Sequence, residues 1–318
     1  MEAVRFLVRR NAALALMVAL MWPLGALLSA AVNPYYLQII VYIGINVILA
    51  VSLNLINGIT GQFSLGHAGF MAIGAYVSAA FTLFVWPSAP PAGLWVALAL
   101  GGLAAAAAGL VIGIPTLRLR GDYLAIATLG FGEIIRVVIV NTDRVGGARG
   151  LFGIPVLASF ASVYACAVAC VVLLARLVYS PKGKALAAIR EDETAAAAMG
   201  IDTTRLKIMA FIIGAFWAGV AGGLFAHFIG YIHTNSFTFL KSIEIVVMVV
   251  LGGMGSFSGA ILAAAALTIL PELLRFGAEY RMIVYSILLV VMMLTRPTGL
   301  LGNREITTWL SSKPSPAR

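Results

Sequence analysis

Long apolar runs separated by short polar breaks restrict what this sequence can fold into. A helix needs about 20 apolar residues to cross a lipid bilayer, and fewer suffice where a segment is broken or re-entrant. We therefore predict an all-α, polytopic integral membrane protein with about ten membrane segments, including short or re-entrant ones. The predicted segments are residues 12–32, 36–56, 64–85, 93–114, 123–141, 156–179, 208–230, 242–252, 259–275 and 282–295.

The composition excludes an ordinary soluble domain. Hydrophobic residues make up 62% of the 318 positions, charged residues make up 10%, and the mean hydropathy is +1.03. Because no polar stretch is long enough to bury its own core, we predict one membrane domain over residues 1–318, with a flexible tail at 304–318. The net charge of +9 is explained by basic residues on the cytoplasmic side rather than by nucleic-acid binding. This positive-inside pattern places both termini in the cytoplasm.

Residues 181–207 form the longest polar interruption of the sequence. Ser180 can cap a short surface helix and Gly200 can end it, after which Asp202 or Thr203 can cap the next membrane helix. Such a segment must lie in water, where a soluble motor could bind it and push on the membrane helices. A solvated loop helix that only satisfies the topology is the alternative.

Two short segments between apolar runs share a pattern, at residues 61–64 (GQFS) and 255–258 (GSFS). The match suggests an internal duplication in parallel orientation, with chance agreement as the competing explanation. Glycine-rich backbone at 57–69 and 252–259 disfavours continuous helix, and irregular backbone at membrane depth needs protein or a water-filled cavity around it. We predict that these breaks border a translocation pathway, with close helix packing as the alternative. The polar candidates in these two regions are Gln62, Ser64, His67, Ser256 and Ser258.

Ionisable side chains also occur within the predicted segments. Glu133 and Arg136 lie on one helix face in the fifth segment and can neutralise each other. Glu244 lies early in the short eighth segment, and the sequence predicts no local partner for it. Because a charge exposed to lipid costs several kcal/mol, both glutamates are predicted pathway residues. An interhelical polar clamp is the alternative for Glu133.

The sequence lacks the motifs of the common catalytic classes. Gly183 and Lys184 are followed by Ala185 and lack the upstream glycine of a phosphate-binding loop, so this chain does not bind ATP by that route. Neither a zinc-binding helix motif nor a nucleophile elbow is present. Cys166 and Cys170 lie in an apolar run without further ligands nearby, which favours packing over metal binding. We therefore predict no enzymatic activity, no metal and no cofactor in this chain.

Residues 54–76 (NLINGITGQFSLGHAGFMAIGAY) resemble the signature of the inner-membrane permeases of branched-chain amino-acid ABC transporters. Segments that resemble the M-type rather than the H-type of the two permeases are residues 120–123 (RGDY), 128–136 (TLGFGEIIR) and 146–150 (GGARG). Residues 251–256 (LGGMGS) are similar to both types. The resemblance extends over nearly the whole chain, from residue 36 to residue 299.

The resemblance implies a role for residues 181–207. In ABC permeases a cytoplasmic helix with a Glu-Ala-Ala, three residues, Gly pattern docks in a cleft of the ATPase. Ala195, Ala196 and Gly200 match this pattern, whereas the glutamate, Glu193, stands one position early. The residues expected to couple this chain to the ATPase are Arg190, Glu193, Ala195, Ala196 and Gly200.

The resemblance also implies the rest of the assembly, in the bacterial inner (plasma) membrane. A homologous permease, two ATP-binding cassette subunits that bind the ATP, and a periplasmic substrate-binding protein are the expected partners. The leading hypothesis is a permease subunit of an ABC importer for branched-chain or related amino acids, with urea and short amides also carried by relatives. The alternative is an ion-coupled secondary transporter or channel for a small polar solute, with Glu133, Glu244 and His67 carrying protons or ions.

Overall fold

The computed structural model describes residues 21–23, 25, 32–87, 90–117, 119, 121–273 and 290. Within these residues the protein is a bundle of α-helices with a small antiparallel sheet of two strands, β1 (Leu151–Phe152) and β2 (Tyr231–Ile232). The helices are α2 (Pro34–Asn54), α3 (His67–Ala80), α4 (Gly93–Thr116), α5 (Asp122–Val140), α6 (Phe160–Val178), α7 (Pro181–Glu191), α8 (Glu193–Ala198), α9 (Thr203–Ile229), α10 (Phe239–Gly252) and α11 (Phe257–Leu273). Shorter helical turns are η1 (Leu55–Ile59), η2 (Phe81–Val85), η3 (Asp143–Val145), η4 (Gly147–Arg149) and η5 (Thr234–Phe237).

Seven helical segments of the described chain are long and apolar enough to cross a membrane. They are Pro34–Ile59, His67–Val85, Gly93–Thr116, Asp122–Val140, Phe160–Val178, Thr203–Ile229 and Thr234–Gly252. With the shorter apolar helix α11, they account for the predicted segments from 36–56 to 259–275. The predicted segment 12–32 lies mostly outside the described residues. The segment 282–295 lies almost wholly outside them, and the tail 304–318 lies wholly outside them. The multi-pass helical fold is confirmed, while the total of about ten segments and the side of the termini stay predictions.

Small residues bring α3, α4 and α9 into close contact. A Cβ atom added at Gly74 would lie 2.1 Å from the carbonyl oxygen of Gly219, and one added at Gly219 would lie 2.6 Å from the Cβ of Ala105. Gly109 meets Ala215 of α9 in the same way, at 2.8 Å. Lipid tails are as apolar as these helices, so close backbone packing must hold the helices together.

The two glycine-rich breaks occupy equivalent places in the bundle. The first joins α2 to α3, and the second joins α10 to α11. Helices α2 and α10 run in the same direction, because Asn46 of α2 contacts Lys241 near the start of α10, and Asn54 contacts Gly255 just beyond its end. This parallel placement agrees with the predicted duplication.

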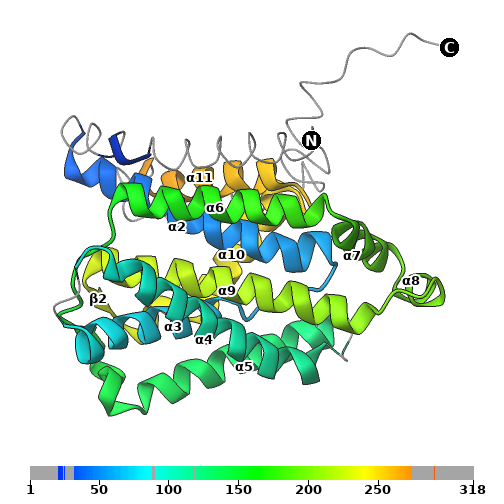
Figure 1. Ribbon diagram of the computed structural model, residues 1–318, viewed down its shortest axis with the longest axis horizontal. Helices are drawn as coiled ribbons and strands as arrows, with labels where there is room; N and C mark the ends of the chain where they lie inside the picture. Colours follow the sequence, from blue (N-terminus) through cyan, green and yellow to red (C-terminus); the bar gives the residue numbers. More distant parts are fainter. Residues whose placement is uncertain are drawn as a thin grey trace, which may run out of the picture.

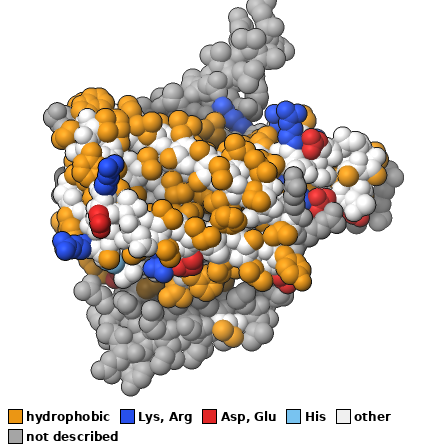
Figure 2. Space-filling model, turned by 90° about the horizontal axis from the view of Figure 1, so that it is seen from below, with side chains coloured by type: hydrophobic (Ala, Val, Ile, Leu, Met, Phe, Trp, Pro, Cys, Tyr) orange, Lys and Arg blue, Asp and Glu red, His pale blue; other side chains and the backbone are white. Residues whose placement is uncertain are grey.

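The bundle has polar ends and an apolar middle. Figure 1 shows α7 and α8 at one end of the bundle and strand β2 at the other. Exposed apolar side chains such as Leu103, Val111 and Ile126 lie on the long helices α4 and α5. Figure 2 shows apolar side chains over the middle of one face, with charged side chains mostly toward its ends. This distribution fits a bundle whose middle lies in lipid.

Alanine at position 74 is expected to destabilise the protein, because its Cβ would meet the backbone of α9, which cannot rotate away. We expect Gly74→Ala to cost about 1–3 kcal/mol, seen as a lower thermal midpoint of the detergent-purified protein. Gly130→Ala is the matched control, since no atom lies within 4 Å of a Cβ added there. Equal midpoints for the two variants would contradict the close approach of α3 and α9.

Candidate coupling and translocation site

The first break begins where α2 widens into the π-helical turn η1. The amide and the hydroxyl of Thr60 both donate to the carbonyl of Leu55, at 3.2 and 2.8 Å. Gly61 follows with a φ of 73°, a left-handed conformation that suits glycine and ends the helix. Residues 55–60 are buried, so the helix ends inside the bundle. π-Helical turns are rare and often occur at functional sites.

Polar side chains replace the missing helical bonds of the backbone that follows. Asn57 accepts from the amide of Ser64 at 3.2 Å and donates to its carbonyl at 3.3 Å. Thr128 of α5 accepts from the amide of Leu65 at 3.0 Å. The irregular backbone is tolerated at this depth because protein groups satisfy it in place of water.

Three of the predicted pathway residues are buried at this break. The exposed fraction is 4% for Gln62, 1% for Ser64 and 1% for His67. The Nε2 atom of His67 lies 2.9 Å from the hydroxyl of Ser52. Its Nδ1, the hydroxyl of Ser64 and both side-chain polar atoms of Gln62 have no hydrogen-bond partner among the described residues. Buried polar atoms without a partner cost about 1–3 kcal/mol each. The pathway role of these residues stays a prediction.

The second break turns at Gly255, which has a φ of 97°. Ser256 is fully buried, and its hydroxyl accepts from the amide of Gly259 at 3.1 Å, which caps α11. Ser258 is only partly buried in the first turn of α11. Asn54 at the end of α2 holds this break in place: it accepts from the Gly255 amide at 2.8 Å and donates to the Ser256 carbonyl at 3.0 Å. The two breaks are thus joined through one side chain.

Arg190, near the end of α7, reaches the contact between the two breaks. Its Nη1 atom donates to the carbonyl oxygen of Gly58 at 2.8 Å. A Cβ added at Gly255 would lie 2.8 Å from the same nitrogen, and one added at Gly61 would lie 3.1 Å from the Cγ of Arg190. Gly58 and Gly255 are themselves in contact, since a Cβ added at Gly58 would lie 2.4 Å from the Gly255 nitrogen. The polar stretch is therefore bonded directly to the broken membrane helices.

The polar stretch folds into two short helices, where the sequence analysis predicted one. Asp192 is extended, with a φ of −155°, and its carboxylate accepts from the amides of Thr194 and Ala195 at 2.8 and 3.0 Å. This second N-cap interrupts the predicted helix and starts α8. The predicted caps at Ser180 and Asp202 are confirmed, at the starts of α7 and α9.

The predicted ATPase-coupling residues other than Arg190 lie on or beside α8. Glu193 forms an ion pair with Lys207 of α9 at 2.5 Å, and Ala196 is buried. Ala195 is exposed, as is Gly200, whose φ of 83° lets it follow α8 as the predicted helix end. Met199 between them is 83% exposed, so the tip of α8 offers an apolar contact. The ATPase-coupling role of these residues stays a prediction.

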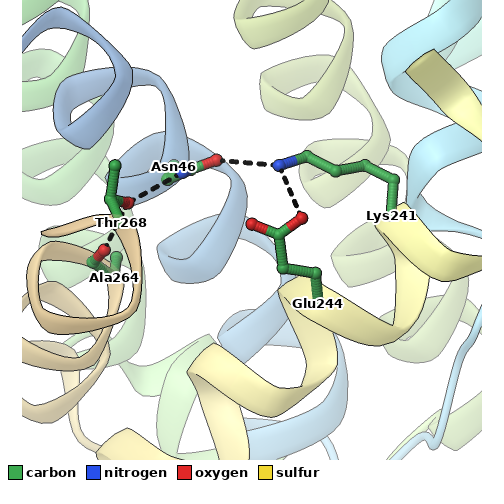
Figure 3. Close-up of polar contacts among 5 residues, drawn as sticks. All are labelled: Asn46, Lys241, Glu244, Ala264 and Thr268. Carbon is green, nitrogen blue, oxygen red and sulfur yellow. Dashed lines mark hydrogen bonds and ion pairs between the residues drawn. The ribbon is translucent and has the colours of Figure 1, made fainter. Parts of the chain in front are cut away.

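A chain of polar contacts runs from α10 across α2 to α11 (Figure 3). Lys241 Nζ lies 3.1 Å from Oε2 of Glu244 and 3.3 Å from Oδ1 of Asn46. Asn46 Nδ2 donates to the hydroxyl of Thr268 at 2.8 Å, and that hydroxyl donates to the carbonyl of Ala264 at 2.6 Å. The expectation that Glu244 lacks a local partner was wrong, because Lys241 stands one helical turn before it. Four of these residues, all but Ala264, line a cavity of about 220 Å³.

Glu133 and Arg136 form the predicted ion pair on α5, with 2.7 Å between Oε2 and Nε. Both side chains are partly exposed, at 35% and 30%. Glu133 borders a cavity of only about 10 Å³, which barely holds one water molecule. The contact favours mutual neutralisation within α5, and a pathway role for Glu133 stays a prediction.

Comparison with known proteins identifies the family of this chain. The family model for the permease component of branched-chain amino acid transport systems matches residues 35–294. This chain belongs to that family.

Relatives of both permease types match the chain. It is 41% identical over 292 residues to the high-affinity branched-chain amino acid transport system permease protein LivM of Salmonella typhimurium, and to the LivM of Escherichia coli by the same measure. Each match covers 81% of this chain and 68% of the relative. It is 37% identical over 130 residues to LivH of Escherichia coli, covering 40% of this chain and 42% of the relative. No solved structure matches the chain. The M-type resemblance predicted from the sequence motifs is confirmed.

Sequence reasoning missed the residues that hold the breaks and the cavity of this permease together. They are Asn46, Asn54, Asn57, Thr128 and Ser242. Ser242 of α10, for example, accepts from the amide of Ala68 at the start of α3, at 3.1 Å. The available signal was a polar side chain within an apolar run, which must find a hydrogen-bond partner in the bundle. The partners themselves are distant in sequence and left no local pattern.

Removing the Asn54 side-chain amide is expected to loosen both breaks. Asn54→Ala leaves the partly buried Gly255 amide and the buried Ser256 carbonyl without their partner, so we expect a loss of about 1–3 kcal/mol in unfolding free energy. Asn141→Ala is the matched control, because its amide also donates to a backbone carbonyl but is exposed. The measurement is the thermal midpoint in detergent. A smaller loss for Asn54→Ala than for Asn141→Ala would contradict its bridging role.

Proposed function

We propose that this chain is a permease subunit of an ABC importer for branched-chain or related amino acids. Its membership of the permease family supports the transport role, and its seven candidate spans support a multi-pass membrane protein. The names of its LivM and LivH relatives support a transport system with two permease types. The expected further partners are two ATP-binding cassette subunits, which would bind the ATP, and a periplasmic substrate-binding protein. The bacterial inner membrane is the corresponding location.

The end of the bundle that carries α7 and α8 is proposed to face the cytoplasm, together with both chain termini. Lys182 and Lys184 lie on this end, as do Arg190 and Arg205. Cytoplasmic loops of membrane proteins carry an excess of such basic residues. The β1–β2 end then faces the binding protein.

The hydrogen bond from Arg190 to Gly58 is the observation that carries the mechanism. An ATPase that binds the exposed tip of α8 would move α7 with it, because α7 and α8 are in contact. Arg190 then transfers that movement to Gly58 and, through the adjoining Gly255, to both breaks. Irregular backbone between rigid helices can absorb a change in φ and ψ, so the breaks would act as hinges.

The breaks also supply the polar surface that a passage requires. Gln62, Ser64 and His67 hold the unpaired polar atoms of the first break. Ser256 and Ser258 lie at the second break, beside the contact with Arg190. We infer that movement at the breaks opens these groups alternately to the two sides of the membrane. An ion-coupled carrier has less support, because it accounts neither for the family nor for the link between α7 and the breaks.

Copurification tests the assembly directly. A tagged chain extracted from native membranes in mild detergent should retain a second polytopic protein and ATPases with phosphate-binding loops, identified by mass spectrometry. Replacing both Glu193 and Gly200 in one variant should weaken ATPase retention. Glu193 anchors α8 through its ion pair with Lys207, and Gly200 ends that helix. Recovery of the chain alone, with uptake that survives ATP depletion and collapses with the proton gradient, would establish the ion-coupled alternative.

Arg190→Ala should uncouple ATP hydrolysis from transport. The change removes a charged hydrogen bond to a buried carbonyl, so we expect ATP-driven uptake to fall about tenfold while the ATPases remain bound. The measurement is substrate carried per ATP hydrolysed in proteoliposomes. Arg190→Lys keeps a charged group that can donate to the Gly58 carbonyl, so it should retain more uptake than Arg190→Ala. Arg205→Ala, at an exposed arginine of the same stretch, is the control that should leave the ratio unchanged; an unchanged ratio in Arg190→Ala would remove the proposed link.

A further inference from the structure

The cavity beside Lys241 and Glu244 carries two opposite charges and no net charge. The two groups lie 3.1 Å apart, and their side chains are 21% and 36% exposed, so each keeps an accessible side. An ammonium group has three donors, and two acceptors are found for Lys241 among the described residues. A carboxylate can accept several hydrogen bonds at once. The pair can therefore bind a further acceptor at Lys241 and a further donor at Glu244.

The bonds around this pair fix its orientation. Because Thr268 donates its hydroxyl proton to Ala264, its oxygen must accept from the Nδ2 of Asn46. The Oδ1 of Asn46 is thereby turned toward Lys241, as Figure 3 shows. A series of hydrogen bonds that ends on the α11 backbone therefore fixes the position of the Lys241 ammonium before a ligand binds. Such preorganisation favours binding.

The rest of the cavity wall is largely apolar. Ile45, Met71 and Leu267 line it from α2, α3 and α11 and are almost completely buried, and Phe225 lines it from α9. The volume of about 220 Å³ corresponds to about seven water molecules, which is the size of a small metabolite. Apolar walls with a few fixed polar groups are the usual construction of a ligand pocket.

We propose that this cavity binds the zwitterion of an α-amino acid with an aliphatic side chain, its carboxylate on Lys241 and its ammonium on Glu244 and the Asn46 oxygen. This inference rests on the proposed importer function and deepens it by assigning a binding site to its substrate. Paired charges in a low-dielectric site favour a ligand that carries both charges and is neutral as a whole. Urea and short amides carry neither charge, and a simple cation or anion would bring a net charge to a site whose own pair is neutral.

The ion pair of α5 offers a comparison within the same chain. Glu133 and Arg136 have the same spacing of three residues, but the cavity beside Glu133 is about 10 Å³. The pair in α10 borders a cavity with room for a ligand, and its bonds continue to α2 and α11. The difference lies in the space beside the charges rather than in their spacing.

The site is also connected to the hinges. α10 carries Lys241 and Glu244 near its start and ends at Gly252, beside the second break. α2 carries Asn46 toward the middle and Asn54 at its end, where Asn54 holds Gly255. A zwitterion that draws Lys241 and Asn46 together acts on the two helices that end at the breaks.

The test uses the purified permease complex without its binding protein, so that receptor selectivity cannot contribute. L-leucine is the probe, with isocaproate, which lacks the ammonium, and isoamylamine, which lacks the carboxylate, as matched analogues, and urea as the neutral amide. We expect L-leucine to raise the thermal midpoint and to bind at least about tenfold more tightly than the other three. Glu244→Gln and Lys241→Met should each abolish this shift in the isolated complex. In proteoliposomes that also contain the binding protein, each variant should reduce ATP-driven leucine uptake about tenfold. Asp143→Asn, an exposed carboxylate at η3, is the control and should change neither.

Swapping the two charged residues distinguishes a ligand-binding role of the pair from a purely structural one. The double variant Lys241→Glu with Glu244→Lys can re-form the pair and the fold, but it reverses the charges that the ligand meets, so leucine binding should stay lost. Full recovery of binding in this variant, or normal binding in both single variants, would overturn the proposal. Preferential binding of urea or isocaproate would overturn it as well. ATP-driven uptake by the wild-type complex would still uphold the importer function in each of these cases, whereas its absence for every solute would remove that function itself.

Discussion

The requirement that every backbone polar group find a partner inside a bilayer governs this structure. Two helices end within the bundle, and lipid offers nothing to the groups that are set free there. Asn57 and Asn54 supply those bonds at the first and second break, and Arg190 adds one from the polar end of the molecule. These side chains stabilise the broken helices, and the same bonds connect the breaks to each other and to α7.

This network connects features that lie far apart in the sequence. α2 and α10 run in parallel from the charged cavity to the two breaks, so a ligand bound in the cavity would contact both helices that end there. α7 contacts that hinge from the other side through Arg190. A substrate at one end and a motor at the other would thus bias the same bistable element, which is what reciprocal coupling between two sites requires.

Several elements could be predicted because their signal is local. The caps at Ser180 and Asp202 and the ion pair between Glu133 and Arg136 depend on neighbours within one helical turn, and the structure contains all three. The single surface helix was predicted wrongly, because the cap that Asp192 provides for α8 competes with helix continuation. Arg190 was assigned to an external partner, yet it reaches Gly58, a contact that no local pattern indicates.

The sequence by itself determined the membrane class, the approximate spans, the glycine-rich breaks and the family, because hydropathy and motifs are written in consecutive residues. Only the tertiary structure decided what the polar residues in those spans do. Lys241 meets Asn46, and Asn54 meets Gly255, at separations of 195 and 201 residues. Such pairs arise from how helices pack against one another, since a hydrogen bond depends on distance in space and leaves no trace in the order of the chain.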